Sequence, residues 1–361
     1  MKKFLFLFVA LLPTMLFAGV QGALSGQFSV SATKKVYFSQ GNLQYQASTN
    51  TFRFASAQYT RIGVSGNNNV SATYTGWIDW YGWGTGNNPT KKTEVSSEYS
   101  SFTDWGVNAI SNGGNQANLW RTLTKAEWEY LFSGRANAAS RRSMATVNDV
   151  KGYIFLPDSW SLPSGISFTA DVQNSWTKNK YTSAQWQLME QNGAVFLPKT
   201  ASISENSSGP DNYYDTGWNG DDHCNYWSST QASSVNAYVF QCFLSDYYIS
   251  SHGVSVDGSK KYHRQGVRLV LDSDKNTTYT ITTSASNGNV TGGGEYVNGA
   301  SAQLTAIANE CYEFVQWSDG NTDTPRTVTV TGDATYTAEF EKSTYTVKGE
   351  DSTGGKVKVE E

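Results

Sequence analysis

Residues 119–132 read LWRTLTKAEWEYLF and contain the clearest helix signal in the sequence. Thr124 and Glu127 have the spacing of a capping box, in which two side chains satisfy backbone amides of the first helical turn. Three large apolar side chains then follow at the spacing of one helix face, namely Trp128, Leu131 and Phe132. Gly134 is a typical stop. The pattern predicts a helix that buries an aromatic stripe in a core.

A second helix is predicted in residues 182–193, TSAQWQLMEQNG, where Thr182 and Gln185 can form the same box and Gly193 supplies the stop. Most other segments before Asp272 are short strand-like runs such as KGYIFLP, NAYVFQCFL and GVRLVL, separated by irregular loops. Two helices packed on short antiparallel strands, with long loops between the later strands, predict an α+β domain.

The composition indicates a globular protein of two to three domains. Of 361 residues, 16% are charged and 14% are aromatic, with 12 Trp and 21 Tyr, so uncharged polar side chains must cover much of the surface. The net charge is −4, and Lys and Arg are scattered along the chain. This leaves no basic footprint for nucleic acid, which we exclude as a partner.

The first residues, MKKFLFLFVALLPTMLFAG, have the layout of a secretory signal peptide, predicted for residues 1–18. No second apolar stretch is long enough to span a bilayer, so we expect a secreted or cell-surface protein with no membrane span in the mature chain. Three cysteines do not make a disulfide framework, although Cys224 and Cys242 can pair; Cys311 lies in another predicted domain.

The sequence changes character near Asp272. The polar segment 273–278 is predicted to be a linker, and the following text alternates Thr and Val, as in RTVTVTGDATYTAEF. The pattern that begins at Tyr279 returns at Tyr345, which predicts a small, mostly β repeat domain at 279–341 and the start of a second, truncated copy at 343–361.

Five motifs give the first part a family likeness: LWRTLTKAEWEYLF, IFLPDSW, AVFLPKTA, NYWSST and GVRLVL. Together they resemble the C-type-lectin-like domains shared by the formylglycine-generating (sulfatase-modifying) enzymes and the variable proteins of diversity-generating retroelements. The resemblance implies an α+β C-type-lectin-like domain at 24–272. Residues 279–341 resemble a divergent internalin B-type repeat, which implies a stalk module of an exported bacterial protein.

The resemblance also allows a test for catalysis. Formylglycine-generating enzymes use a close pair of cysteines before a terminal Gly-Phe-Arg, whereas the matching interval 241–268 contains only Cys242. A lone thiol cannot supply a two-thiolate site for a soft metal. The DDHC run at 221–224 lacks the spacing of a zinc site, and LPDSW at 156–160 lacks the acid or amide of a calcium-dependent sugar site. We therefore predict no catalytic residues, no metal and no cofactor.

The remaining function is binding. In the retroelement variable proteins the ligand surface lies between the Trp-Ser-Ser-Thr motif and the terminal Gly-Val-Arg-Leu, which correspond here to residues 225–268. This interval is rich in Tyr, Ser, Asp and His, the residue types that suit adaptable contacts. The predicted ligand-binding residues are Ser245, Asp246, Tyr247, Tyr248, Ser250, His252, Tyr262 and His263. Trp227 is predicted to fill the core, and Arg268 to pair with an acid.

These observations predict an exported bacterial binding or adhesion protein that presents a lectin-like surface on β-repeat modules. Its partner would be a protein or glycan on another surface. Two alternatives stay open at this point: a relative of the formylglycine-generating oxidases that has exchanged its thiols, and a structural fimbrial or matrix subunit.

Overall fold

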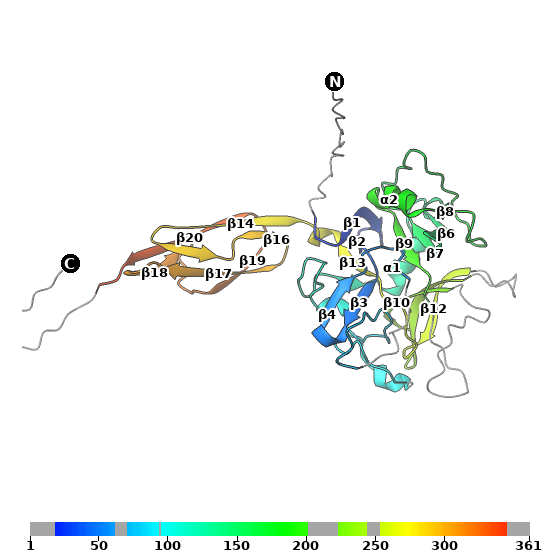
Figure 1. The fold of residues 1–361 in the computed structure, drawn as a ribbon, viewed down its shortest axis with the longest axis horizontal. Helices are drawn as coiled ribbons and strands as arrows, with labels where there is room; N and C mark the ends of the chain where they lie inside the picture. The colour runs from blue at the N-terminus through cyan, green and yellow to red at the C-terminus, as the bar shows by residue number, and fades with distance from the viewer. Residues whose placement is uncertain (1–18, 62–70, 94, 201–222, 244–252, 345–361) are drawn as a thin grey trace, which may run out of the picture. The chain divides into compact units, whose positions relative to one another are not determined.

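The computed structural model describes residues 19–61, 71–93, 95–200, 223–243 and 253–344 (Figure 1). The chain divides into two compact units, Met1–Thr277 and Thr278–Glu361. The division falls within the segment 273–278 that the sequence predicts as a linker. Inside this segment Ser273–Lys275 forms one turn of 3-10 helix before the first strand of the second unit begins at Thr278.

The prediction of an α+β fold is wrong, because the structure is mostly β, with 41% of its residues in strands and 12% in helices. Both predicted capping boxes are present, at Thr124 and at Thr182, but the helices that they start are short. α1 (Lys125–Glu129) has five α-helical residues before the chain widens into a π-helix at Tyr130–Gly134, and α2 (Ser183–Gln191) has nine. The two helix signals therefore correspond to two short helices in a mostly β unit.

Four sheets make up the described part of the first unit. The first sheet contains, in spatial order, β1 (Ala23–Ser29), β2 (Lys35–Ser39), β13 (Leu269–Asp272) and β5 (Arg121–Thr122). A two-stranded sheet pairs β3 (Leu43–Gln46) with β4 (Thr51–Phe54). The third contains β8 (Lys180–Tyr181), β6 (Arg142–Val147), β7 (Val150–Phe155) and β9 (Val195–Pro198). The fourth contains β10 (His223–Gln231), β11 (Asn236–Phe243) and β12 (Gly253–Lys260).

Arg121, in the stretch that predicts the first helix, joins the start of α1 to the last strand of the unit. Its guanidinium lies 2.7 Å from a carboxylate oxygen of Glu127 and 2.7 Å from one of Asp272. Glu127 also accepts a hydrogen bond from the backbone amide of Thr124 as part of the capping box. The same side chain thus caps α1 and fixes the end of β13 through Arg121.

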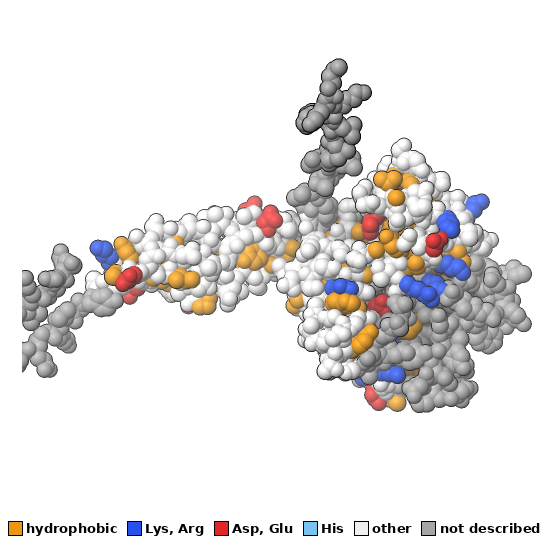
Figure 2. Space-filling model, in the orientation of Figure 1, with side chains coloured by type: hydrophobic (Ala, Val, Ile, Leu, Met, Phe, Trp, Pro, Cys, Tyr) orange, Lys and Arg blue, Asp and Glu red, His pale blue; other side chains and the backbone are white. Residues whose placement is uncertain are grey.

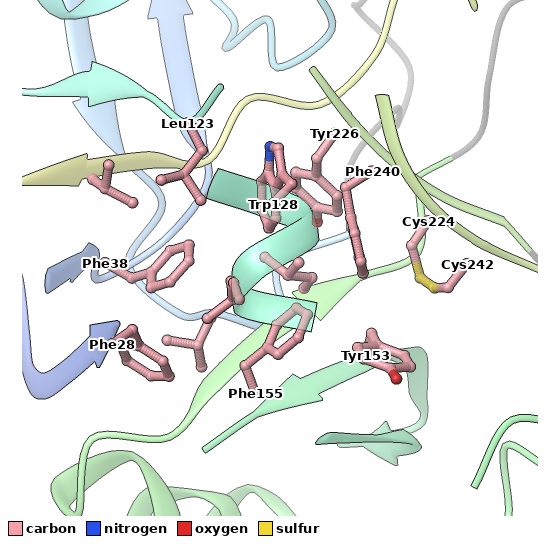
Figure 3. Packing of buried hydrophobic residues seen from close by; sticks show 14 of the residues in the cluster. Phe28, Phe38, Leu123, Trp128, Tyr153, Phe155, Cys224, Tyr226, Phe240 and Cys242 are labelled. Carbon is pink, nitrogen blue, oxygen red and sulfur yellow. A yellow bond between two sulfur atoms is a disulfide. The ribbon is translucent and has the colours of Figure 1, made fainter. Parts of the chain in front are cut away.

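The core of the first unit is aromatic. Trp128 of α1 stacks on Phe240 of β11, with ring centroids 4.9 Å apart and planes 18° apart. Tyr153 and Phe155 of β7 pack edge-on to one another and contact the same Phe240 ring. The predicted burial of the apolar stripe is confirmed for Trp128 and Leu131, which have no exposed surface, whereas Phe132 is half-buried and packs against the same cluster. Figure 3 shows this cluster, with rings from several sheets around α1.

Charged side chains are sparse on the described surface. On the face shown in Figure 2, most of it consists of uncharged polar side chains and backbone, with Lys, Arg, Asp and Glu in separate places. This agrees with the composition, in which only 16% of residues are charged.

The second unit consists of strands in its described part. One sheet has the order β16 (Gly294–Val297), β14 (Thr278–Ala285), β20 (Ala334–Lys342) and β18 (Tyr312–Trp317), and the other has β15 (Gly288–Thr291), β17 (Ser301–Ala308) and β19 (Arg326–Thr329). β14 and β20 are parallel, so the two ends of the repeat pair with each other. Trp317 is fully buried among aliphatic side chains that include Leu304 and Ala338, and the Phe314 ring packs edge-on to it at 5.6 Å between centroids.

Candidate functional site

The three-stranded sheet β10-β11-β12 carries the interval predicted to bind ligand. Cys224 of β10 lies directly opposite Cys242 of β11, and the two sulfurs form a disulfide. β11 and β12 are paired to their last residues, with Phe243 opposite Gly253. The two strands that flank segment 244–252 are therefore joined at its attachment points and fixed by the disulfide one residue away.

One face of this sheet is anchored in the aromatic core. Tyr226 and Phe240 lie opposite each other and are fully buried, as are the bridged cysteines (Figure 3). The Tyr226 hydroxyl donates to the carbonyl oxygen of Pro198 at 2.7 Å. Burial raises the pKa of Tyr226, so this phenol stays neutral and acts as a structural donor.

The second face of the sheet is also covered at β10 and β11, which the sequence pattern did not predict. Trp227 and Val239 lie on it and are buried. The Trp227 indole donates to the carbonyl oxygen of Tyr81 at 2.6 Å, and Trp83 donates to that of Ser228 at 3.0 Å. The run WYGWGTG at residues 80–86 therefore packs on this face. The scaffold role predicted for Trp227 is confirmed.

Six of the eight predicted ligand-binding residues lie outside the described part of the chain: Ser245, Asp246, Tyr247, Tyr248, Ser250 and His252. The other two, Tyr262 and His263, are half-buried after the end of β12, with ring centroids 5.0 Å apart in an edge-to-face arrangement. The Ser259 hydroxyl lies 3.1 Å from Nδ1 of His263.

The register of β12 separates the anchors of these two groups. Segment 244–252 attaches at Gly253, whereas Tyr262 and His263 follow Lys260 at the other end of the strand. Seven residue steps at about 3.3 Å each place these ends about 23 Å apart. The cluster of all eight residues stays a prediction, and the described strand shows only that the two groups attach at opposite ends of β12.

Lys261 and Trp83, which the sequence analysis did not single out, contact each other next to Tyr262. The backbone amide of Trp83 donates to the carbonyl oxygen of Lys261 at 2.8 Å. The Lys261 ammonium lies 4.7 Å from the Trp83 ring centroid and donates to the carbonyl oxygen of Ser234 at 3.1 Å. The aromatic and glycine residues of WYGWGTG were the available signal for this close packing.

Arg268, predicted to pair with an acid, donates instead to an amide. Its guanidinium lies 2.7 Å from Oε1 of Gln58, whose amide nitrogen donates to Glu190 at 2.8 Å. Burial lowers the pKa of Arg268 to about 10 and raises that of Glu190. Gln58 therefore links the buried Arg268 to the half-buried Glu190, and Arg268 has the scaffold role that the sequence predicts for it.

The described residues contain no group of three or more His, Cys, Asp and Glu side chains that could hold a metal ion. In the DDHC run, Asp221 and Asp222 lie outside the described part, and the Cys224 sulfur is bonded to Cys242. Asp158 of LPDSW accepts hydrogen bonds from the amide and hydroxyl of Ser29 and pairs with the buried Arg135. Its carboxylate therefore has a structural role.

The comparisons identify the second unit. Residues 279–344 match the model of the family described as Divergent InlB B-repeat domain. The internalin B-type repeat predicted at 279–341 is therefore confirmed, and it is consistent with a bacterial surface or binding protein. No curated protein and no solved structure matches the chain. Within the described ranges, no helix has the length and apolar character needed to cross a membrane.

Proposed function

We propose that this protein is an exported bacterial binding protein whose first unit recognises a protein or glycan on another surface, without catalysis, and whose second unit is a repeat module that presents it. The match of residues 279–344 to a divergent InlB B-repeat supports the surface location. A signal peptide at residues 1–18, outside the described part, would provide export.

The three-stranded sheet carries this proposal. Both of its faces are buried at β10 and β11, these two strands are joined by Cys224–Cys242, and the last pair of β11 and β12, Phe243 with Gly253, flanks a segment whose sequence is rich in Tyr and Ser. A rigid scaffold that bears polar and aromatic segments is the arrangement that binding loops use, because loop residues can change without loss of the core.

The proposed relationship to the retroelement variable proteins rests on sequence motifs. Two of these motifs have structural roles that a shared scaffold would need: residues 119–132 contain the Arg121–Glu127 pair and Trp128, and GVRLVL contains Arg268 and the first three residues of β13. We propose that the interval between Trp227 and Arg268 is the recognition region in this chain also.

An oxidase of the formylglycine-generating type is the less favoured function. Its chemistry needs free thiols, and Cys242, which alone represents that pair in the interval 241–268, is bonded to Cys224. The two cysteines belong to the same buried cluster as Tyr226, Phe240 and Tyr153 (Figure 3). These sulfurs support the sheet and are closed to a substrate.

The test is binding of the purified exported chain to fixed bacterial and epithelial cells, measured by flow cytometry. We expect saturable binding that falls at least tenfold in the double variant Tyr247→Ala/Tyr248→Ala. Tyr74→Ala, at a half-exposed tyrosine outside the interval 225–268, should bind as the wild type does. Equal binding by both variants would refute the proposed surface, and copper-dependent oxidation of a cysteine peptide would support the enzyme instead.

A further inference from the structure

A second candidate site lies in the first unit, in a pocket that none of the predicted ligand-binding residues lines. It is a cavity of about 190 Å³ between the turn that begins at Trp83 and the 3-10 helix Ser96–Tyr99. Its lining residues are Trp83, Gly84, Thr85, Asn87, Asn88, Lys91, Glu98, Tyr99 and Ser101. This volume is smaller than the cavities that hold drug-sized ligands and suits a single ring.

The backbone that forms the pocket is closely held. Thr103 and the turn exchange two hydrogen bonds, from the amide of Gly86 to its carbonyl at 3.0 Å and from its amide to the carbonyl of Gly84 at 3.1 Å. Gly84 has a φ of +68°, and a Cβ there would lie 2.8 Å from the Cα of Phe102. The pocket therefore depends on a glycine that lets two segments approach, and it is preformed.

Its inner wall is occupied by internal contacts. Tyr99 is buried, and the Lys91 ammonium lies 4.6 Å from its ring centroid and donates to the carbonyl oxygen of Glu98. Thr85 donates to the carbonyl oxygen of Gly82 at 2.9 Å. The Lys91 ammonium is thus held by a hydrogen bond to a carbonyl oxygen and by a cation–π contact.

The mouth of the pocket offers unused hydrogen-bonding groups. The side chains of Asn87, Asn88 and Ser101 are exposed and make no hydrogen bond to the described part of the chain. Two amides and a hydroxyl provide both donors and acceptors. The exposed Glu98 carboxylate adds acceptors at the same rim. A hydroxyl group, which both donates and accepts, is the ligand group that matches such a mixed set.

We propose that this pocket binds one uncharged, hydroxyl-rich ring, such as a single sugar unit. An anion such as a phosphate or carboxylate only accepts hydrogen bonds and would leave the acceptor oxygens of the Asn and Ser side chains unmatched. Lys91 and Glu98 carry opposite charges at the same pocket, so neither a cation nor an anion gains a net attraction there. A neutral polyol can both donate to and accept from Asn87, Asn88 and Ser101.

The proposal goes beyond the proposed function, since it uses none of the residues 245–252. The pocket adjoins the other end of the sheet through the bond between Trp83 and Lys261, the residue before Tyr262. A sugar unit bound here would lie on the side of β12 where Tyr262 and His263 are anchored, about 23 Å along the strand from Gly253.

The experiment titrates the full exported chain with a panel of uncharged methyl pyranosides and detects binding by ligand-observed NMR. We expect a dissociation constant on the order of 1 mM for at least one of them. Asn87→Ala/Asn88→Ala and Ser101→Ala should each weaken binding about tenfold, with unchanged unfolding midpoints because these side chains are exposed. Asn174→Ala, at an exposed asparagine elsewhere in the unit, is the matched control and should bind normally.

Several outcomes overturn the pocket: no pyranoside bound at 100 mM, equal affinity in the pocket variants, or binding only of sulfated or phosphorylated sugars. If oligosaccharides bind tenfold more tightly than the pyranosides, the bound ring belongs to a glycan. If the affinities are equal, the ligand is a free sugar. Both results support the pocket. Tyr247→Ala/Tyr248→Ala should retain pyranoside binding, so failure of the cell-binding proposal is distinguished from failure of this one.

Discussion

The two units of the chain solve the same problem, burying enough apolar surface, in different ways. The first packs large rings from several sheets around α1, and Trp128, Tyr226 and Phe240 in this cluster are fully buried. In the described part of the second, Trp317 is the only aromatic residue among the buried members of the cluster, the others are Ala, Val, Leu and Ile, and partly buried rings such as Phe314 and Phe340 pack against them.

This difference explains what each unit can carry. A core of large aromatic rings with a disulfide can support irregular segments such as WYGWGTG and a pocket between them, because the strands of the core do not depend on those segments alone. The second unit is built from regular strands around a mainly aliphatic buried cluster, and its two ends pair, as β14 and β20 do, which suits a repeated module. Recognition is therefore expected in the first unit and presentation in the second.

The largest effect on stability should follow from removing the buried tryptophan in the core of the second unit. Trp317→Ala is expected to cost about 3 to 5 kcal/mol, which is comparable with the whole stability of a domain of this size. The second unit should then lose its protection from hydrogen exchange, followed by mass spectrometry on the full chain. The matched variant Trp128→Ala should cost a similar amount and leave the first unit folded. Survival of the second unit in Trp317→Ala would contradict the contrast.

Removing the disulfide tests how much it stabilises the core of the first unit. Cys224 and Cys242 are 18 residues apart in sequence, and closing a loop of this length stabilises a fold by about 3 kcal/mol. Cys224→Ala/Cys242→Ala should lower the free energy of unfolding of the first unit by about this amount, measured by urea titration, without changing the second.

Two controls define that result. A reductant should destabilise the wild type as the double substitution does and should not affect the double variant further. Cys311→Ser, at the exposed free cysteine of the second unit, should have no effect on the first. A shift of the first unit in Cys311→Ser would show that the effect is not due to the bridge.

The sequence predicted local features of the first unit better than its class. Capping boxes at Thr124 and Thr182, the burial of Trp128 and Trp227, and the strand at GVRLVL were readable because each depends on a short range of residues. The α+β class was wrong, since a capping box shows where a helix starts and does not show how soon it ends. The π-helix at Tyr130–Gly134 ends α1 three residues earlier than a pattern with Phe132 on its face suggests.

The candidate sites were harder to predict for a physical reason. The pocket near Trp83 depends on contacts between a turn and a 3-10 helix, and on a glycine at φ +68°, none of which has a periodic signal. The link between Arg268 and Glu190 runs through Gln58, which is 210 residues away from Arg268 in sequence. The repeat was predicted correctly because it has a signature spread along consecutive strands.

The smallest expected difference between the two units is in how much stability each loses at acidic pH. Burial acts to raise the pKa of Asp158 in the first unit, but hydrogen bonds from Ser29 and the charge of Arg135 hold it below its usual value. In the second unit, the hydrogen bond from Arg326 lowers the pKa of Asp319. A carboxyl whose pKa is depressed on folding stabilises the fold above about pH 4, and this contribution is lost as the pH falls through the folded pKa.

Exposure decides which unit responds. The Asp158 side chain is 18% exposed and faces the buried Arg135, whereas Asp319 is 42% exposed, so solvent screens its pair with Arg326. In urea titrations between pH 6 and pH 2.5, Asp158→Asn should be less stable than the wild type at pH 6, and the difference should shrink as the wild-type carboxyl is protonated. Asp319→Asn should change the second unit by less than about 1 kcal/mol at every pH. A difference for Asp158→Asn that stays constant to pH 2.5 would show that its role is packing and that charge does not distinguish the units.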